Sequence, residues 1–240
     1  MLFAEWRLIF TGAADGYVNM AIDEATLILV GEGRVPPTVR IYSWDSPFCT
    51  VGYLQCISQL KPLLSQSSGC KYVRRLTGGK ACLHGGDLSY SLIVSMSDTL
   101  IPASVLDSYE RISSGVIEGL RLLGFDARYA PPTDVQIDGH IIATSAQARK
   151  QGVLLHQGTI ALKPCPIDRL QELPCLSLMP ISELVGGEIN IEDGARALGM
   201  GFKRALGVDL SPSILFAKEK RLARQLLREK YMRAEWTFCR

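Results

Sequence analysis

The sequence predicts an α+β fold, with a mixed, largely antiparallel sheet flanked by helices. Segments of helical periodicity and short segments rich in Val, Ile, Tyr and Thr follow one another in groups, not in regular βαβ alternation. Gly, Pro and Ser separate the strand-like segments. No internal repeat or low-complexity linker divides the chain, so we expect a single domain over residues 1–240.

The first half of the chain predicts one helix and a series of strands. Residues 17–31 carry apolar side chains at helical spacing, and Gly31 is placed to end the helix. Pro36 and Pro37 follow, where a helix cannot continue. The strand-like segments after them are 38–44, 48–54, 71–75 and 88–96.

The second half predicts a long helix, further strands and two closing helices. The long helix covers 103–124, with Gly124 as its stop. Strand-like segments are 135–137, 140–148 and 153–162, and a Pro-punctuated loop is expected over 163–188. One closing helix is expected over 191–206. The other is expected from about residue 212, with Ser211 as N-cap and Pro212 in the first helical position.

Composition excludes several classes of protein. With 47% hydrophobic and 21% charged residues, the chain has the make-up of a folded globular domain. A net charge of +2 argues against nucleic acid as the main partner. No membrane span or secretory signal is visible, so we expect a cytoplasmic protein. The seven cysteines form no CxxC pair and no zinc-ligand spacing, which indicates reduced thiols.

Residues 74–91, RRLTGGKACLHGGDLSYS, carry the strongest chemical signal. Arg74-Arg75 precede the turn Thr77-Gly78-Gly79-Lys80, whose backbone amides can form an anion-binding nest. Arginine adds paired donors suited to a carboxylate or phosphate. The simpler interpretation is a hairpin turn with solvated cations. The convergence of these donors, with His84 and Asp87 directly after them, favours a binding site.

This run resembles the signature of the lipoate–protein ligase and octanoyltransferase family, Arg-Arg-x-Ser/Thr-Gly-Gly-x-Ala-x-x-His. Further matches follow in the family's order along most of the chain. They are Asn19-Met20-Ala21-Ile22-Asp23-Glu24; Arg40, Tyr42, Trp44, Pro47, Gly52 and Gln55; Asp134, Asp138-Gly139 and Ser145-Ala146-Gln147; His156-Gln157-Gly158-Thr159; and Lys230-Tyr231 with Glu235-Trp236. The resemblance implies the fold of the biotin- and lipoate-ligase catalytic domains. A biotin ligase itself is disfavoured, because its Gly-Arg-Gly-Arg loop is absent.

The resemblance implies acyl transfer onto a lysine of a lipoyl carrier domain protein. The leading hypothesis is an ATP-dependent lipoate–protein ligase, in which ATP, Mg²⁺ and lipoate or octanoate form an acyl-adenylate. Lys80 and Arg75 would be catalytic, because they place positive charge where negative charge develops. The expected binding residues are Arg74, Thr77, Gly78, Gly79, Ala81, His84, Asp87, Asp134, Ser145, Ala146, His156, Gly158, Thr159 and Asn19. Asp134 is a candidate ligand for Mg²⁺ or a ribose hydroxyl, or simply an exposed turn acid.

The sequence departs from the family pattern at one decisive position. The ligases carry Gly-Arg-Lys where this chain has Gly139-His140-Ile141, and isoleucine cannot supply the lysine's charge. Lys80 is the favoured replacement, with His140 or Lys150 as alternatives. If adenylation is lost, the chain acts only in transfer or only in binding.

A transferase would need a nucleophilic cysteine, and none lies at the family's positions in this chain. The regions where the octanoyltransferases carry it hold Ala130-Pro131 and 143–145 instead. Cys82 is the candidate nucleophile for this second hypothesis, because Arg75 and Lys80 would lower its pKa. A third hypothesis is a non-catalytic lipoyl-binding subunit. No C-terminal accessory domain is expected after Trp236, so active-site closure would need a separate lid subunit or the 163–188 segment.

Overall fold

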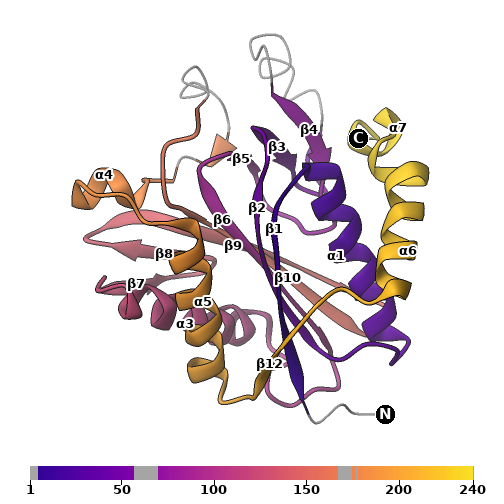
Figure 1. Cartoon of the computed structure of the whole chain (residues 1–240), viewed down its shortest axis with the longest axis horizontal. Coiled ribbons are helices and arrows are strands. Elements are labelled where there is room, and N and C mark those ends of the chain that lie inside the picture. The colour runs from indigo at the N-terminus through magenta and orange to yellow at the C-terminus, as the bar shows by residue number, and fades with distance from the viewer. Residues whose placement is uncertain (1–4, 57–69, 167–174, 177, 240) are drawn as a thin grey trace.

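The computed structural model describes residues 5–56, 70–166, 175–176 and 178–239. Its centre is an eight-stranded sheet in the order β12-β1-β2-β6-β10-β9-β8-β7 (Figure 1). The strands are β1 (Trp6–Ala14), β2 (Thr38–Trp44), β6 (Asp87–Ser95), β7 (Ala127–Ala130), β8 (Asp134–Ile137), β9 (His140–Lys150), β10 (Val153–Ala161) and β12 (Leu210–Ser213). Strand β1 pairs in parallel with β2 and β12, and the other pairings are antiparallel. The prediction of a mixed, largely antiparallel sheet is confirmed.

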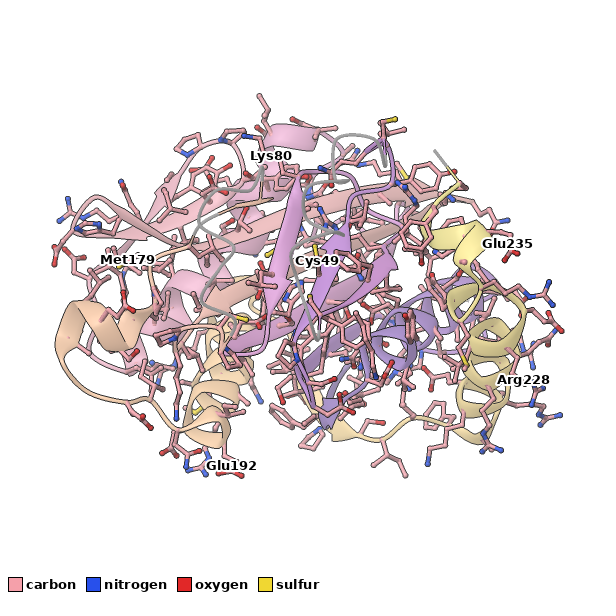
Figure 2. All side chains as sticks on the ribbon, turned by 90° about the horizontal axis from the view of Figure 1, so that it is seen from above. Cys49, Lys80, Met179, Glu192, Arg228 and Glu235 are labelled. Carbon is pink, nitrogen blue, oxygen red and sulfur yellow. The ribbon has the colours of Figure 1, made fainter. Side chains whose placement is uncertain are left out.

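A smaller sheet holds the signature motif. Its order is β11-β5-β3-β4, with β3 (Phe48–Val51), β4 (Lys71–Arg74), β5 (Ala81–His84) and β11 (Cys175–Leu176). Strand β5 is antiparallel to β3, and β4 is parallel to it. The glycine turn therefore connects β4 to β5 at one edge of the molecule, where Lys80 projects (Figure 2).

Two groups of helices pack on the large sheet. Helices α3 (Val105–Leu122) and α5 (Ile191–Leu206) form one group, and α1 (Gly16–Gly31) and α6 (Ala217–Leu226) form the other (Figure 1). A π-helical turn, Leu227–Tyr231, and α7 (Ala234–Thr237) continue α6, while α4 (Ile181–Val185) precedes α5. The helices expected over 17–31, 103–124 and 191–206 are confirmed within about two residues at each end.

The alternation of side chains along each strand explains how the sheet packs against both groups of helices. In β2, Val39 and Ile41 belong to the core cluster under α3 and α5, whereas Tyr42 and Trp44 belong to the cluster under α1 and α6. Successive side chains of a strand point to opposite faces, so one buried strand supports two cores.

The helix predicted from residue 212 is wrong, because Ser211 and Pro212 lie in strand β12. Pro212 pairs with Leu8 at the sheet edge, where a residue without a backbone N–H is tolerated. Helix α6 begins at Ala217 instead, after the backbone N–H of Phe216 donates to Glu219 at 2.8 Å.

The other differences between the predicted and the observed secondary structure concern short or interrupted elements. Strands β1 and β7 were not predicted, and β1 carries an irregularity between Phe10 and Gly12 that breaks its alternation. The expected loop over 163–188 contains β11 and α4, while residues 167–174 and 177 of it lie outside the described residues. Among the described helices, none combines the length and the hydropathy needed to cross a membrane.

Candidate active site

A cavity of about 320 Å³ lies where the small sheet meets strands β8, β9 and β10. Met20 of α1, Tyr42 and Trp44 of β2 and Tyr109 of α3 contribute large side chains to its lining. The glycine turn and the later family motifs, which are far apart in sequence, meet at this one cavity.

The structure brings most of the predicted site residues to the cavity lining. They are Arg75, Gly78, Gly79, Lys80, Cys82, His84, Asp134, Ser145, Ala146, Gly158 and Thr159. The predicted residues outside the lining are Asn19, Arg74, Thr77, Ala81, Asp87 and His156. All six are buried, and five of them make side-chain hydrogen bonds that support the site.

Asn19 and Thr77 position the cavity walls. The Asn19 amide donates to the backbone oxygen of Ser43 at 3.1 Å and accepts from Arg40, which ties α1 to β2. Thr77 donates to the Gln157 side chain at 2.8 Å, which joins the glycine turn to β10. Gln157 lines the cavity itself.

Arg74 is wholly buried among backbone carbonyls. Its guanidinium donates to the carbonyl oxygens of Gly52 at 2.8 Å, Gln55 at 2.9 Å and Thr237 at 3.1 Å. The side chain therefore holds α7 and the segment after β3 against β4. It has a supporting position beneath the site and does not face the cavity.

Arg75 braces the glycine turn from inside. Its guanidinium donates to the backbone oxygens of Thr50 at 3.1 Å, Gly78 at 2.5 Å and Lys80 at 2.8 Å, and to the Thr50 hydroxyl at 3.0 Å. Burial lowers the pKa of Arg75, and the largest opposing influence is the electrostatic interaction with Cys82. One buried cation thus fixes the turn and lines the same cavity as the cysteine.

Gly52 permits the close approach of this turn. A Cβ atom at residue 52 would lie 1.9 Å from the Gly79 carbonyl oxygen. Gly79 itself has φ of +85°, in the left-handed region that favours glycine. The turn geometry therefore depends on glycine at both positions.

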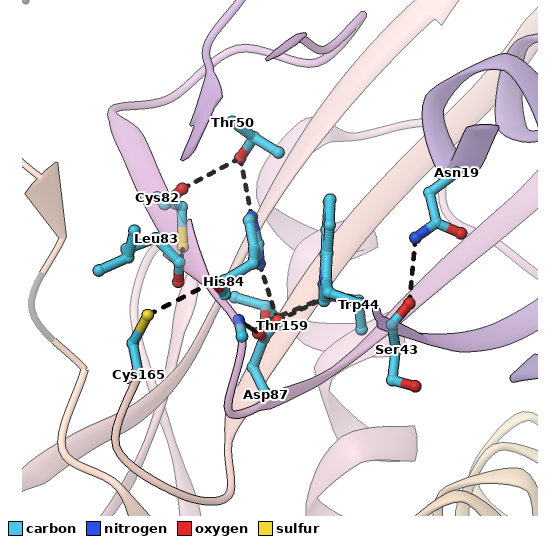
Figure 3. A network of polar contacts seen from close by, with 12 residues as sticks. Asn19, Ser43, Trp44, Thr50, Cys82, Leu83, His84, Asp87, Thr159 and Cys165 are labelled. Atoms are coloured by element: carbon cyan, nitrogen blue, oxygen red, sulfur yellow. Dashed lines mark hydrogen bonds and ion pairs between the residues drawn. The ribbon is translucent and has the colours of Figure 1, made fainter. Parts of the chain in front are cut away.

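His84 is held on both ring nitrogens (Figure 3). Nδ1 lies 2.7 Å from Asp87 Oδ2 and Nε2 lies 2.9 Å from the Thr50 hydroxyl. The Trp44 ring stacks on the imidazole with centroids 4.0 Å apart. Burial would raise the pKa of Asp87, but the charge and hydrogen bond of His84 and the hydrogen bonds from Thr159 and Gly85 outweigh it, so this pKa is lowered.

Cys82 lies on the same side of β5 as His84, because the two are two residues apart on one strand. Thr50 of β3 stands directly opposite Cys82 in the antiparallel register. The Thr50 hydroxyl lies 2.9 Å from His84 Nε2 and 3.5 Å from the Cys82 carbonyl oxygen (Figure 3). The Cys82 thiol itself donates to the Leu83 carbonyl oxygen at 3.8 Å. Cys82 is only 5% exposed and lines the cavity.

Asp134 and Lys80 supply polar groups at another part of the cavity. Asp134 Oδ1 accepts from the hydroxyls of Thr133 at 2.8 Å and Thr144 at 2.6 Å. Within the described part of the chain, no three His, Cys, Asp or Glu side chains gather to hold a metal ion. One carboxylate fits Mg²⁺ only where substrate phosphates supply the remaining ligands.

The position of the missing ligase lysine lies at the start of β9. Ile141 is half-buried, and its carbonyl oxygen accepts from Met179 N at 2.8 Å. His140 is exposed, and Lys150 Nζ lies 4.7 Å from the centroid of the Tyr53 ring. Among the described lysines, only Lys80 belongs to the cavity lining.

Thr50 and Tyr109 are cavity residues that the sequence did not single out. Thr50 sits in a predicted strand of ordinary composition, and only its register against Cys82 reveals it. Side chains alternate between the two faces of a strand, so the predicted strand 48–54 already placed Thr50 on the same face as Phe48. Tyr109 belongs to an amphipathic helix and gave no comparable signal.

The family model for the lipoyl protein ligase A/B catalytic domain matches residues 15–172. The chain belongs to this family. The resemblance inferred from the sequence motifs is confirmed. Similar curated proteins of the lipoyl protein ligase A/B family include octanoyltransferase LipM of Kyrpidia tusciae, 36% identical over 97% of this chain and 98% of that protein. Octanoyltransferase LipM of Geobacillus kaustophilus is 34% identical over 98% of both.

Solved structures of lipoate ligases share the fold of this family member. A lipoate-protein ligase A bound with ATP superposes with a TM-score of 0.83 at 26% identity, over 98% of both chains. Ta0514, a putative lipoate protein ligase from Thermoplasma acidophilum, gives 0.84 at 27% identity, over 98% of this chain and all of that one. The expected biotin- and lipoate-ligase type of fold is confirmed.

Proposed function

We propose that this protein transfers an octanoyl or lipoyl group from a thioester donor to a lysine of a lipoyl-domain protein, with Cys82 as the acyl-carrying nucleophile. The observation that carries the proposal is the shared position of Cys82 and His84 on the cavity side of β5, with Arg75 beside them. Relatives that cover 97% and 98% of this chain are named octanoyltransferases, which supports transfer over adenylation.

The proposed reaction has two exchanges and consumes no ATP. Cys82 gives up its thiol proton and the thiolate attacks the donor thioester carbonyl; a new C–S bond forms, the old C–S bond breaks, and the donor sulfur takes up that proton and leaves as a thiol. The neutral lysine amine of the lipoyl domain then attacks the Cys82 thioester; the C–N bond of the amide forms, the Cys82 C–S bond breaks, and the proton lost by the amine returns to Cys82. A thiolate beside a fixed cation is the activated form that such a nucleophile needs.

The cavity size also supports transfer. About 320 Å³ is near the lower end of the range of roughly 300–1,000 Å³ for small-molecule pockets. A single acyl chain needs less space than an acyl chain joined to a nucleotide. Ile141 supports the same conclusion, because it supplies no charge at the position of the ligase lysine.

The test is a transfer reaction in the absence of ATP. The purified enzyme is mixed with octanoyl-loaded acyl carrier protein and an unmodified lipoyl domain. The mass of the lipoyl domain is then measured by mass spectrometry. We expect octanoyl-lysine with the wild type and with Cys49→Ala, a buried cysteine of β3 outside the cavity lining. Cys82→Ala should give none. Retained transfer by Cys82→Ala would contradict the proposal.

The second candidate is an ATP-dependent lipoate–protein ligase. It is favoured by the joint presence of Asp134 and Lys80 in the cavity lining, and by the likeness to a ligase bound with ATP. In that case Asp134 would hold Mg²⁺, which neutralises phosphate charge, and Lys80 would stand near the acyl carboxylate. Product that forms only with free lipoate, ATP and Mg²⁺, and is lost in Lys80→Ala, would select this function.

The partner in either case is a lipoyl-domain protein. A solved neighbour at 24% identity is described as a bipartite lipoate protein ligase with its E2 lipoyl domain, which supports a partner of this kind. The separate lid subunit expected from the sequence stays a prediction. Product formation by the chain alone would make that subunit unnecessary. Product from either reaction would also exclude a purely binding role.

A further inference from the structure

Gln157 lies where a buried polar network reaches the cavity. It belongs to β10, is 7% exposed and lines the cavity. Its amide oxygen accepts from Thr77, and its amide nitrogen Nε2 donates to Asp23 and lies against Met20. The bond with Thr77 ties the glycine turn to β10. The other two contacts decide which atom of the amide faces the cavity.

Asp23 of α1 is a buried carboxylate whose acceptor positions are filled. Its Oδ1 accepts from Arg40 Nη1 at 2.7 Å, in an ion pair, and from Ser91 Oγ at 2.9 Å. Its Oδ2 accepts from Gln157 Nε2 at 2.7 Å and from Tyr42 OH at 3.5 Å. A carboxylate offers about four acceptor positions, so these donors hold the group in one place. Asp23 is only 1% exposed, which keeps water from competing for it.

This carboxylate fixes the orientation of the Gln157 amide. The two ends of a glutamine amide have nearly the same shape, and a threonine hydroxyl can donate or accept. Thr77 alone would therefore allow either end to face it. Asp23 paired with Arg40 only accepts, so the NH₂ end of the amide faces Asp23. The oxygen end then faces Thr77, whose hydroxyl donates to it at 2.8 Å.

The second N–H of the amide has a weak acceptor at the cavity wall. Nε2 lies 3.5 Å from Met20 Sδ, and Met20 lines the same cavity. A thioether sulfur accepts hydrogen bonds only weakly, and a methionine side chain adapts its shape easily. A carbonyl oxygen in the cavity would therefore be the better partner for this N–H.

We propose that Gln157 is a substrate-binding residue whose Nε2 donates to the carbonyl oxygen of the acyl group, and that Asp23 is the positioning residue that keeps this donor turned to the cavity. This deepens the proposed function and rests on the acyl group lying in this cavity. An octanoyl chain is apolar except at its carbonyl end, and Met20, Tyr42 and Trp44 supply apolar lining for the chain. A donor that is already oriented needs no rearrangement when negative charge develops on that oxygen.

The test measures the binding of octanamide, an unreactive compound with an octanoyl carbonyl, by isothermal titration calorimetry at neutral pH. Gln157→Glu keeps the shape of the side chain and removes the N–H that faces the cavity. The new carboxyl group can share a proton with Asp23 and still accept from Thr77, so the contacts within the network are kept. We expect the dissociation constant of octanamide to rise about tenfold, the effect of one lost hydrogen bond.

Asp23→Asn tests the positioning role. An asparagine at this place can donate to Gln157, which lets the glutamine amide turn over and present its oxygen to the cavity. We expect the same rise of about tenfold in the dissociation constant. The matched control is Ser91→Ala, which removes another donor to Asp23 without touching the amide. This variant should bind octanamide as the wild type does.

Unchanged binding in Gln157→Glu would overturn the inference, and so would an equal loss in Ser91→Ala or a wild type that does not bind octanamide. Binding needs no acyl transfer, so the two proposals fail separately. Octanamide binding that depends on Gln157, without any transfer to a lipoyl domain, would support this role and contradict the transferase. Thermal melting shows whether each variant is folded, and Gln157→Met replaces a variant that does not fold, with the same expected loss.

Discussion

The stability of this protein should depend on pH through His156. This side chain lies on β10 and is wholly buried between Tyr90 OH, 3.2 Å from Nε2, and the Gln147 amide nitrogen, 3.0 Å from Nδ1. Burial lowers the pKa of His156 from 6.5 to about 3. Among the residues that the structure describes, no hydrogen-bond partner of His156 is a carboxylate that could offset a proton on this ring, so the folded protein keeps the ring neutral.

The sign and size of the effect follow from linkage. Below pH 6.5 the unfolded chain binds a proton at His156 that the folded protein does not bind until about pH 3. The free energy of unfolding is therefore lost as the pH falls through this window. The loss from this group is about 2 kcal/mol at pH 5 and about 4 kcal/mol at pH 3.

Urea unfolding at pH 7 and pH 5, followed by tryptophan fluorescence, measures this loss. We expect the wild type to lose about 2 kcal/mol more than His156→Gln between the two pH values, because the variant has no imidazole to protonate. His140→Gln is the matched control, since His140 is exposed to water, and it should behave like the wild type. Equal losses in the wild type and His156→Gln would refute the reasoning, whatever the stability of the variant at pH 7.

Three further substitutions test the architecture of the cavity. Gly52→Ala should displace the glycine turn, because the new Cβ would lie 1.9 Å from the Gly79 oxygen; urea unfolding should show a loss of about 1–3 kcal/mol, and transfer should fail. Arg75→Lys keeps the charge but cannot reach the same four acceptors, so the melting temperature and transfer rate should both fall; an unchanged melting temperature would mean that the bracing is unimportant. Asp87→Asn should lower the transfer rate by about 10²-fold or more, because the amide no longer fixes the His84 proton on Nδ1; a rate within a few-fold of the wild type would contradict that role.

The signature turn was the part of the site that sequence could locate best. A run of Gly, Lys and His in fixed order indicates a site because few residue types give the backbone shape and donors that a turn of this kind needs. The same run could not show what Arg74 and Arg75 do. Both arginines donate to backbone carbonyls of segments remote in sequence, and these acceptors exist only in the folded chain.

The sequence predicted the long helices correctly, and it failed where pairing with a distant strand overrides the local composition. Helix α1 is capped by Asp15, whose side chain accepts from Tyr17 N at 2.8 Å, and buried residues occur along its whole length. The Ser211-Pro212 pair has the composition of a helix start, but pairing of β12 with β1 overrides it. The position of Thr50 in the site could not be predicted from local sequence either, because the register between β3 and β5 decides which residue lies opposite Cys82.

The most direct test of the account is the mass of the enzyme after a single turnover with octanoyl carrier protein and no lipoyl domain. We expect one octanoyl group on the peptide that contains Cys82, released by neutral hydroxylamine and absent in Cys82→Ser treated in the same way. An enzyme that stays unmodified while it still acylates a lipoyl domain, or that carries the group on another residue, would contradict it.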